Sequence, residues 1–381
     1  MKNRLWIVLA SLVLAIPTPA LSAPAVAAEA NQRWSEARAK AWYQHQPWLT
    51  GANYAPATAI NQLDMWQEES FDPAQIDREL GWARQFGMNT MRVYLHDLAY
   101  SQDPHGFKRR VDRFLDIAER HGIRPMFVLF DSCWDPDPRV GPQHPPIPGV
   151  HNSGWLQSPG RKDLIDPGQD RKLRRYVEDV VGSFAKDERV LAWDLWNEPD
   201  NSGGGGYNDE QLAQERVRIE HLLPQAFGWA RAQRPIQPLT SALWDGDDWS
   251  PGSTTLNRIQ QVQLAESDVI TFHNYGWPES FEARIAQLRP YGRPILCTEW
   301  LARSAGSTVD AVLPIARREN IGMINWGFVQ GEIQTHLPWD SWQRPYTLQQ
   351  PSVWFHDLLQ PDGTPYRPRE AEIFRTLRLQ K

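Results

Sequence analysis

Glu198 and Glu299 are the two residues of this chain whose type and position most clearly suggest chemistry. Each ends an apolar run with the character of a buried strand; the first run, VLAWDLWNEPD, spans 190–200. Desolvating a carboxylate costs free energy unless a partner or a reaction uses it. Two carboxylates facing one cleft suit hydrolysis of a glycosidic bond, because one protonates the leaving oxygen and the other attacks or activates water. The alternative is that each is an ordinary strand-end residue paired with a Lys or Arg.

The elements that must position these glutamates are short apolar runs separated by segments of helical periodicity. We expect strands near 49–54, 89–95, 124–131, 190–197, 237–244, 268–274, 293–299 and 321–327. The clearest helix has Asp72 as N-cap, Pro73 at its first position and Gly87 at its end. A weaker one contains Pro314, which we expect to break or kink it. Eight alternating strands and helices predict an α/β fold, a single (β/α)8 TIM barrel with long loops at its C-terminal face; a doubly wound open sheet is the alternative.

In such a barrel, functional groups gather at the C-terminal ends of the strands. Polar and aromatic residues gather at the ends of the predicted strands and not at their starts. The residues that we expect to line one concave site are Asn53, Arg92, Trp134, Asn197, Glu198, Trp244, His273, Tyr275, Glu299 and Trp326. Glu198 and Glu299 are separated by close to three βα units of roughly 35 residues each. They would therefore lie on strands 4 and 7, on opposite sides of the cleft.

WNEP at 196–199, followed by TEW at 298–300, resembles the retaining glycoside hydrolases of clan A, and above all family 5 with its cellulase- and mannanase-type enzymes. The resemblance covers most of the chain, from GANY at Gly51 to Trp326 in strand 8. It implies that Glu198 is the acid/base, that Glu299 is the nucleophile, and that Asn197 holds the 2-hydroxyl of the sugar.

The same resemblance assigns supporting roles to four further residues. It implies that Arg92 hydrogen-bonds Glu299, that His273 and Tyr275 flank the two carboxylates, and that Trp326 is the sugar platform. By their chemistry, an always-charged guanidinium can present a fork to a carboxylate and a tyrosine hydroxyl can donate to one. Structural roles stay open for all four: a stabilising ion pair for Arg92, a buried phenol for Tyr275, and core packing for His273 and Trp326.

Two features depart from the family pattern. Family 5 enzymes usually have a His just past strand 3, where this chain reads Asp131-Ser132-Cys133-Trp134. A neighbouring family or an unusual subfamily therefore stays open. The stretch GPQHPPIPGVHNSGWLQSPG at 141–160 also has no obvious counterpart in the family pattern. It lies in a long loop at about 132–168, and loops of that length are uncommon unless functional. We expect it to wall one end of the cleft, with Trp339 and Trp342 after strand 8 as further sugar contacts.

Composition narrows the function classes. The 381 residues include 19 Trp, more than a core needs, and some of these rings should stack on flat ligand faces. The net charge of −6 and the lack of a basic block argue against a nucleic-acid partner. His, Asp and Cys do not fall at metal-ligand spacings, so we predict no catalytic metal and no cofactor. The glycine run at 203–206 opens no helix and is interpreted as a flexible loop.

The N-terminus has the pattern of a secretory signal peptide. Lys2 and Arg4 precede an apolar stretch at 5–17 that is too short to span a membrane comfortably, and Ala25-Val26-Ala27 is a plausible cleavage site. We therefore expect a signal peptide at 1–28, a lead-in at 29–48 and the barrel at 49–381, in a secreted or periplasmic monomer. Cys133 and Cys297 could pair in an oxidising compartment, but we favour two free thiols.

These observations predict a secreted retaining glycoside hydrolase that cleaves the β-linked bonds of a glycan through a glycosyl-enzyme intermediate. A carbohydrate-binding barrel without catalysis is one alternative, and it would explain the tryptophans but not both glutamates. A transglycosylase on the same scaffold, in which a sugar replaces water as the acceptor, is another.

Overall fold

The computed structural model describes residues 32–201 and 209–379 of the chain. The predicted signal peptide and the glycine run at 203–206 lie outside the described residues. The eight strands are β1 (Thr50–Tyr54), β2 (Thr90–Tyr94), β3 (Arg124–Asp131), β4 (Ala192–Asn197), β5 (Leu239–Thr240), β6 (Ile270–His273), β7 (Ile295–Glu299) and β8 (Gly322–Asn325). Each lies at an expected position in the sequence.

The strands form a closed parallel barrel. Their order is β5-β4-β3-β2-β1-β8-β7-β6, and neighbouring strands in this order pair in parallel. The remaining seam, between β5 and β6, is joined by a parallel bridge from Leu243 to Phe272. Around that bridge, Leu243 N donates to Thr271 O at 3.1 Å and His273 N donates to Leu243 O at 2.8 Å. The barrel is confirmed, and the open-sheet alternative is wrong.

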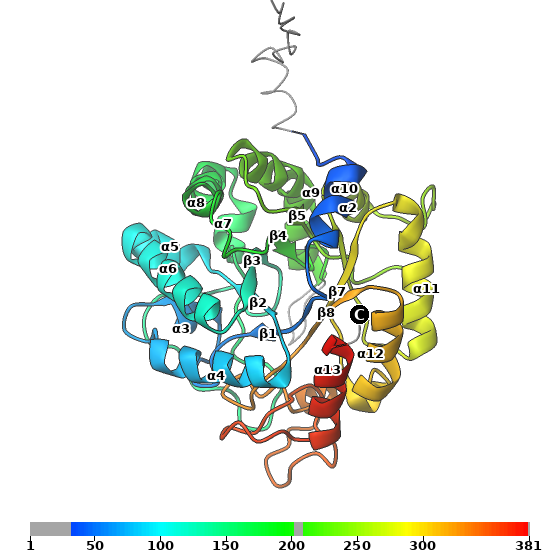
Figure 1. The fold of residues 1–381 in the computed structure, drawn as a ribbon. Coiled ribbons are helices and arrows are strands. Elements are labelled where there is room, and N and C mark those ends of the chain that lie inside the picture. The colour runs from blue at the N-terminus through cyan, green and yellow to red at the C-terminus, as the bar shows by residue number, and fades with distance from the viewer. Residues whose placement is uncertain (1–31, 202–208, 380–381) are drawn as a thin grey trace, which may run out of the picture.

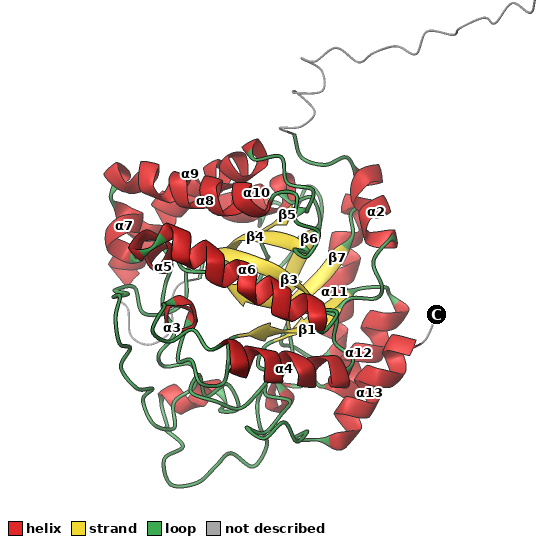
Figure 2. Cartoon of the chain, turned by 60° about the vertical axis from the view of Figure 1, so that its left-hand side comes forward, coloured by secondary structure: helices red, strands yellow, loops and turns green. Residues whose placement is uncertain are grey.

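Helices cover the outside of the barrel (Figures 1 and 2). One helix on the outside of the barrel follows each strand in turn: α4 (Pro73–Phe86), α6 (Pro104–Arg120), α8 (Asp170–Phe184), α9 (Asp209–Ala232), α10 (Arg258–Glu266), α11 (Pro278–Leu288), α12 (Val309–Arg318) and α13 (Pro368–Leu379). Further helices were not expected: α2 (Glu36–Gln44), α3 (Gln62–Trp66), α5 (Asp97–Gln102) and α7 (Arg161–Ile165). These belong to the lead-in and to the loops around the barrel mouth.

Local chemistry explains the two ends of α4. In α4, the Asp72 side chain accepts from Ala74 N and Gln75 N, and Gly87 ends the helix at φ 99°, as expected. Pro314 does not break its helix, because α12 continues through it; the kink, the other expected outcome, stays a prediction. The buried face of α12 includes Val312 and Leu313, so packing outweighs the one backbone hydrogen bond that proline removes.

The lead-in closes the N-terminal end of the barrel. Trp34 is buried, and its backbone N–H donates to Asp268 Oδ1 at 2.7 Å. Further along, Trp48 Nε1 donates to Ile321 O at 2.7 Å, just before β8. Both hydrogen bonds fasten the lead-in to residues that precede the strands β6 and β8. None of the helices in the described part of the chain has the length and apolar composition that crossing a bilayer requires.

Candidate active site

A cavity of about 350 Å³ opens at the C-terminal ends of the strands. It is shaped by loops after β3, β4, β5 and β6 and by the segment after β8. Its lining residues are Cys133, Trp134, His151, Asn152, Trp155, Asn197, Glu198, Asn201, Trp244, Tyr275, Glu299, Trp326, Trp339, Trp342 and Gln343. A hollow lined by indoles with a few convergent polar groups is the usual character of a small-ligand site.

Glu299, the last residue of β7, is held as a carboxylate by three donors. Arg92 Nη1 and Tyr94 Oη donate to its Oε1 at 2.8 and 2.9 Å, and Tyr275 Oη donates to Oε2 at 2.7 Å. The side chains of Arg92 and Glu299 are 0% and 6% exposed. A buried carboxylate with a cation and two hydroxyls around it is fully hydrogen-bonded and has a fixed position.

Arg92, in the middle of β2, is the cation of the site. Besides Glu299, its guanidinium donates to Asp194 Oδ2 at 2.8 and 3.0 Å, to Asn197 Oδ1 at 2.7 Å and to Asn53 Oδ1 at 2.9 Å. Burial alone opposes its charged form, but the oxygens of Tyr94, Asp194 and Glu299 outweigh burial, so its pKa lies above the ordinary value. Arg92 therefore joins β1, β4 and β7 beneath the cavity floor.

Glu198, directly after β4, has a different environment. It is 8% exposed, and burial raises the pKa of its carboxyl to about 7, although Asn201 Nδ2 donates to Oε2 at 2.6 Å. Cys133 Sγ lies 3.5 Å from the same oxygen. Its backbone has φ 40°, in the left-handed region that non-glycine residues rarely adopt and that recurs at functional sites. This carboxyl can hold or release a proton near neutral pH.

His273 joins the two carboxylates. Its Nδ1 is 2.7 Å from Glu198 Oε1 and 3.6 Å from Glu299 Oε2. Burial lowers the pKa of His273 to about 3, so the ring is neutral and accepts or donates at Nδ1 according to its tautomer. A neutral ring leaves the charges of the two carboxylates unchanged.

A metal ion could be held by Glu198, His273 and Glu299 as far as spacing is concerned. Each offers one ligand atom, and the three atoms lie within 4.8 Å of one another. Sequence spacing gave no sign of this cluster, because its members come from three different strand ends. Arg92, 2.8 Å from Glu299, places a positive charge where a cation would bind. The expectation of no catalytic metal therefore stays a prediction.

The two asparagines of the predicted site lie at its floor and edge. Asn197 is 3% exposed; besides accepting from Arg92, it donates from Nδ2 to Asp131 Oδ1 at 2.9 Å and lines the cavity. Asn53 does not line this cavity. Its Nδ2 donates to Thr298 O at 2.8 Å, and it faces a smaller hollow beyond Trp326.

The predicted aromatic residues line the cavity together. Trp244 is held by a hydrogen bond from Nε1 to Asp200 Oδ1 at 2.7 Å. Trp134 packs against Trp342, with 6.2 Å between ring centroids. Trp326 is 9% exposed and is both a wall of the cavity and part of a small buried aromatic cluster.

Sequence reasoning assigned no role to several residues of the site. Asp194 binds Arg92, and Tyr94 binds Glu299. The signal for Asp194 was an acid inside the apolar run VLAWDLW, and Tyr94 was visible only as a strand-end aromatic. Cys133 and Cys297 are both free and buried, as favoured.

Comparisons with known proteins bear on the fold. No family model matches the chain, and no curated protein matches it. Solved structures do: a GH5_18 variant from Streptomyces cattleya in complex with Manβ1-4GlcNAc aligns at 14% identity and TM-score 0.58, over 87% of this chain and 80% of that one.

Two further solved structures also align with most of the chain. The exo-β-1,4-mannosidase of Opitutaceae bacterium strain TAV5 aligns at 19% identity and TM-score 0.56, over 86% of this chain and 59% of that one. The β-mannanase of the blue mussel Mytilus edulis aligns at 15% identity and TM-score 0.53, over 78% and 90%. At these identities the likeness concerns the fold: the chain has the (β/α)8 barrel that its resemblance to clan A and family 5 implies.

Proposed function

We propose that this protein is a retaining glycoside hydrolase that cleaves β-linked glycans in two displacement steps. The observation that carries the proposal is the pair of buried carboxyls of Glu198 and Glu299. They lie in different environments, and their nearest oxygens are within 4.8 Å of each other. Retaining enzymes place their carboxyls about 5–5.5 Å apart, whereas inverting enzymes leave about 6.5–9.5 Å for a water molecule. The short separation supports direct attack by one carboxylate.

In the first step, Glu299 attacks the anomeric carbon and forms a C–O bond while the glycosidic C–O bond breaks. The electron pair of the broken bond goes to the leaving oxygen, which takes the proton of Glu198. The raised pKa of Glu198, about 7, supports this role, because the group still carries its proton near neutral pH. Arg92 and the two tyrosines hold Glu299 charged and in place for the attack.

In the second step, the carboxylate of Glu198 takes a proton from water as the water oxygen attacks the anomeric carbon. The bond to Glu299 breaks, and its electron pair returns to that carboxylate. Two displacements at one carbon restore the original configuration. Arg92 and the tyrosine hydroxyls then stabilise the released carboxylate.

The substrate class follows from the lining of the cavity. Indole faces offer flat apolar surfaces for sugar rings, and Asn197 offers an amide to a hydroxyl. The structural neighbours include enzymes named as a mannosidase and a mannanase and one complex with Manβ1-4GlcNAc. We therefore propose β-mannosides and β-glucosides as the first substrates to examine.

The test is a hydrolysis screen with aryl β-mannoside, aryl β-glucoside and β-1,4-linked manno- and gluco-oligosaccharides. Wild-type protein should hydrolyse at least one of them, and Glu299→Gln, which keeps the shape but removes the charge, should not. A carbohydrate-binding barrel would bind the oligosaccharides without cleaving them. Equal rates for wild type and Glu299→Gln would contradict the proposal.

We also propose that the protein is exported. The support is the basic, apolar and small-residue pattern of residues 1–28. Fractionation of expressing cells, followed by N-terminal sequencing of the product, checks this; a product that keeps residues 1–28 inside the cell would contradict it.

A further inference from the structure

The loops after β3 and β8 are tied together at the mouth of the barrel. The side chain of Gln334 makes three of the links: Nε2 donates to Ile147 O at 2.9 Å and to Val150 O at 3.0 Å, and Oε1 accepts from Gly149 N at 3.1 Å. One side chain from the β8 segment thus takes up three backbone groups of the β3 loop. Such a connection fixes the two loops as one piece.

Further hydrogen bonds continue this seam. His151 N donates to Ser341 Oγ at 2.9 Å, and His151 Nδ1 lies 2.8 Å from Leu337 O. Asn152 N donates to Ile333 O at 2.9 Å. The two segments are therefore joined along their length and not at a single point.

The loop after β1 is joined to both. Asn61 Nδ2 donates to Gly154 O at 2.9 Å, and Glu332 N donates to Ala57 O at 2.9 Å. Since β3, β2, β1 and β8 are consecutive in the barrel, these three loops cover one continuous side of its mouth. We call this cover, formed by residues 55–62, 147–156 and 331–341, the loop wall.

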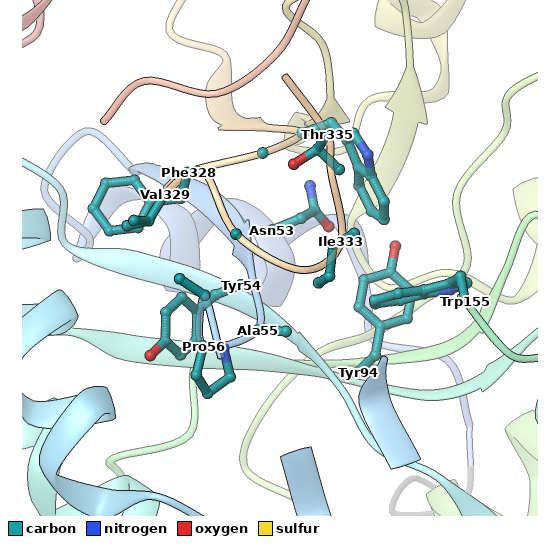
Figure 3. Close-up of a pocket in the computed structure, with 14 residues that line it drawn as sticks. Asn53, Tyr54, Ala55, Pro56, Tyr94, Trp155, Phe328, Val329, Ile333 and Thr335 are labelled. Atoms are coloured by element: carbon teal, nitrogen blue, oxygen red, sulfur yellow. The ribbon is translucent and has the colours of Figure 1, made fainter. Parts of the chain in front are cut away.

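Aromatic rings lie on the inner side of the loop wall, and one of them, Trp155, belongs to it. Trp155 and Trp326 pack edge to face at 5.7 Å, and each meets Tyr94, at 5.1 and 5.9 Å. The hollow beyond them has a volume of only about 30 Å³, enough for water but not for a sugar ring. Figure 3 shows Trp155 and Tyr94 on one side of this hollow and Phe328 and Val329 on the other.

The position of the acid decides which part of the substrate meets the loop wall. Glu198 must reach the leaving oxygen, so the leaving group lies toward β4 and β5, where Trp244 offers an indole. The sugar that becomes bound to Glu299 then lies on the other side, against Trp326. A chain continuing beyond that sugar would run into the loop wall.

We infer that the cavity accepts a single sugar residue on the side that becomes bound to Glu299, so the enzyme removes sugars one at a time from non-reducing chain ends. This inference rests on the proposed function, because it assumes that Glu198 is the acid. It assigns Trp155 and Trp326 to the closed end and Trp244 to the first sugar of the leaving group.

The experiment uses β-1,4-linked mannopentaose and cellopentaose with a fluorescent label at the reducing end, each also with its non-reducing sugar blocked as a 4,6-acetal. Aryl β-mannoside and aryl β-glucoside report independently on glycosidase activity. The expected first products are a free monosaccharide and a labelled tetraose. Blocked pentaoses should be cleaved at least about 100-fold more slowly, a barrier of about 2.7 kcal/mol, because the loop wall must move to admit the acetal.

The outcomes separate the inference from the function on which it rests. Labelled di- or trisaccharides as first products, or equal rates on blocked and free pentaoses, overturn the inference while leaving a glycosidase. No hydrolysis of any probe, aryl glycosides included, removes the proposed function and the inference with it.

Discussion

Arg92 illustrates how one side chain organises the site at the residue scale. Its guanidinium reaches Glu299, Asp194, Asn197 and Asn53, which come from three different strands, β7, β4 and β1. A lysine has a compact charge and cannot present a planar fork to several acceptors at once. The geometry of Glu299, the proposed nucleophile, therefore depends on the guanidinium and not on positive charge alone.

Replacing Arg92 should separate the contribution of its positive charge from that of its guanidinium geometry. We expect Arg92→Ala to lose at least about tenfold in kcat/KM, which is 1.36 kcal/mol of barrier, because Glu299 loses its cation and its position. Arg92→Lys keeps the charge and should also lose activity, though less. Circular dichroism and melting curves confirm that each variant is folded; wild-type turnover in folded Arg92→Ala would contradict this role.

The pH profile tests the assignment of Glu198. Burial raises its pKa to about 7, and the first step needs the protonated form, so kcat/KM on a poor leaving group should fall as pH rises through about 7. Asn201 donates to the carboxyl and favours its ionised form, which lowers the pKa. Asn201→Ala should therefore move the falling limb to higher pH. A limb that stays in place or moves to lower pH would show that another group titrates.

At the scale of elements, the barrel could be predicted because parallel strands buried on both faces leave continuous apolar runs in the sequence. The boundaries were less accurate where polar residues intervene: the expected strand at 237–244 is a strand only at Leu239–Thr240, and its continuation is the bridge at Leu243. Pro314 stays helical for a related reason, since packing outweighs local preference.

Contacts between distant segments could not be predicted from one sequence. Asp194 meets Arg92 across 102 positions, and Gln334 meets Ile147 across 187. Neither residue has a local signal for its partner; only the barrel brings them together. The strand-end residues were found because the fold itself gathers them, whereas the loop wall depends on how long loops pack.

Gln334 gives a direct test of the loop wall. Its φ of 57° suits glycine, so Gln334→Gly removes three hydrogen bonds without adding backbone strain. We expect faster limited proteolysis within 141–152, because each lost bond is worth about 0.5–1.5 kcal/mol of local stability. Asn320→Gly is the matched control, with φ 55° at the opposite end of the barrel. Equal proteolysis of the two variants would contradict the role of Gln334.

At the scale of the whole molecule, the lead-in covers one end of the barrel and the candidate site lies at the other. The lead-in buries Trp34 and Trp48 against residues that precede β6 and β8. The predicted signal peptide ends before the lead-in. Removing the signal peptide should therefore leave the stability of the barrel unchanged, whereas disrupting the lead-in should lower it.

We expect a chain that begins at residue 29 to melt and turn over like the processed protein. Trp34→Ala in that chain should lower stability by about 3–5 kcal/mol, the usual cost of truncating a buried Trp. Trp277→Ala is the control, because that indole is 66% exposed. Denaturant unfolding measures both; a Trp34→Ala variant as stable as the control would show that the lead-in does not support the barrel.

The measurement that most directly tests the central claim is the configuration of the azide products formed by Glu198→Ala and Glu299→Ala from an aryl β-glycoside, determined by NMR. Glu198→Ala should still form the covalent intermediate, since a good leaving group needs no acid, and azide should release it as the β-glycosyl azide. Glu299→Ala has no nucleophile, so any azide product should have inverted configuration. Exchanged outcomes would exchange the two roles, and undiminished hydrolysis by both variants would contradict the account.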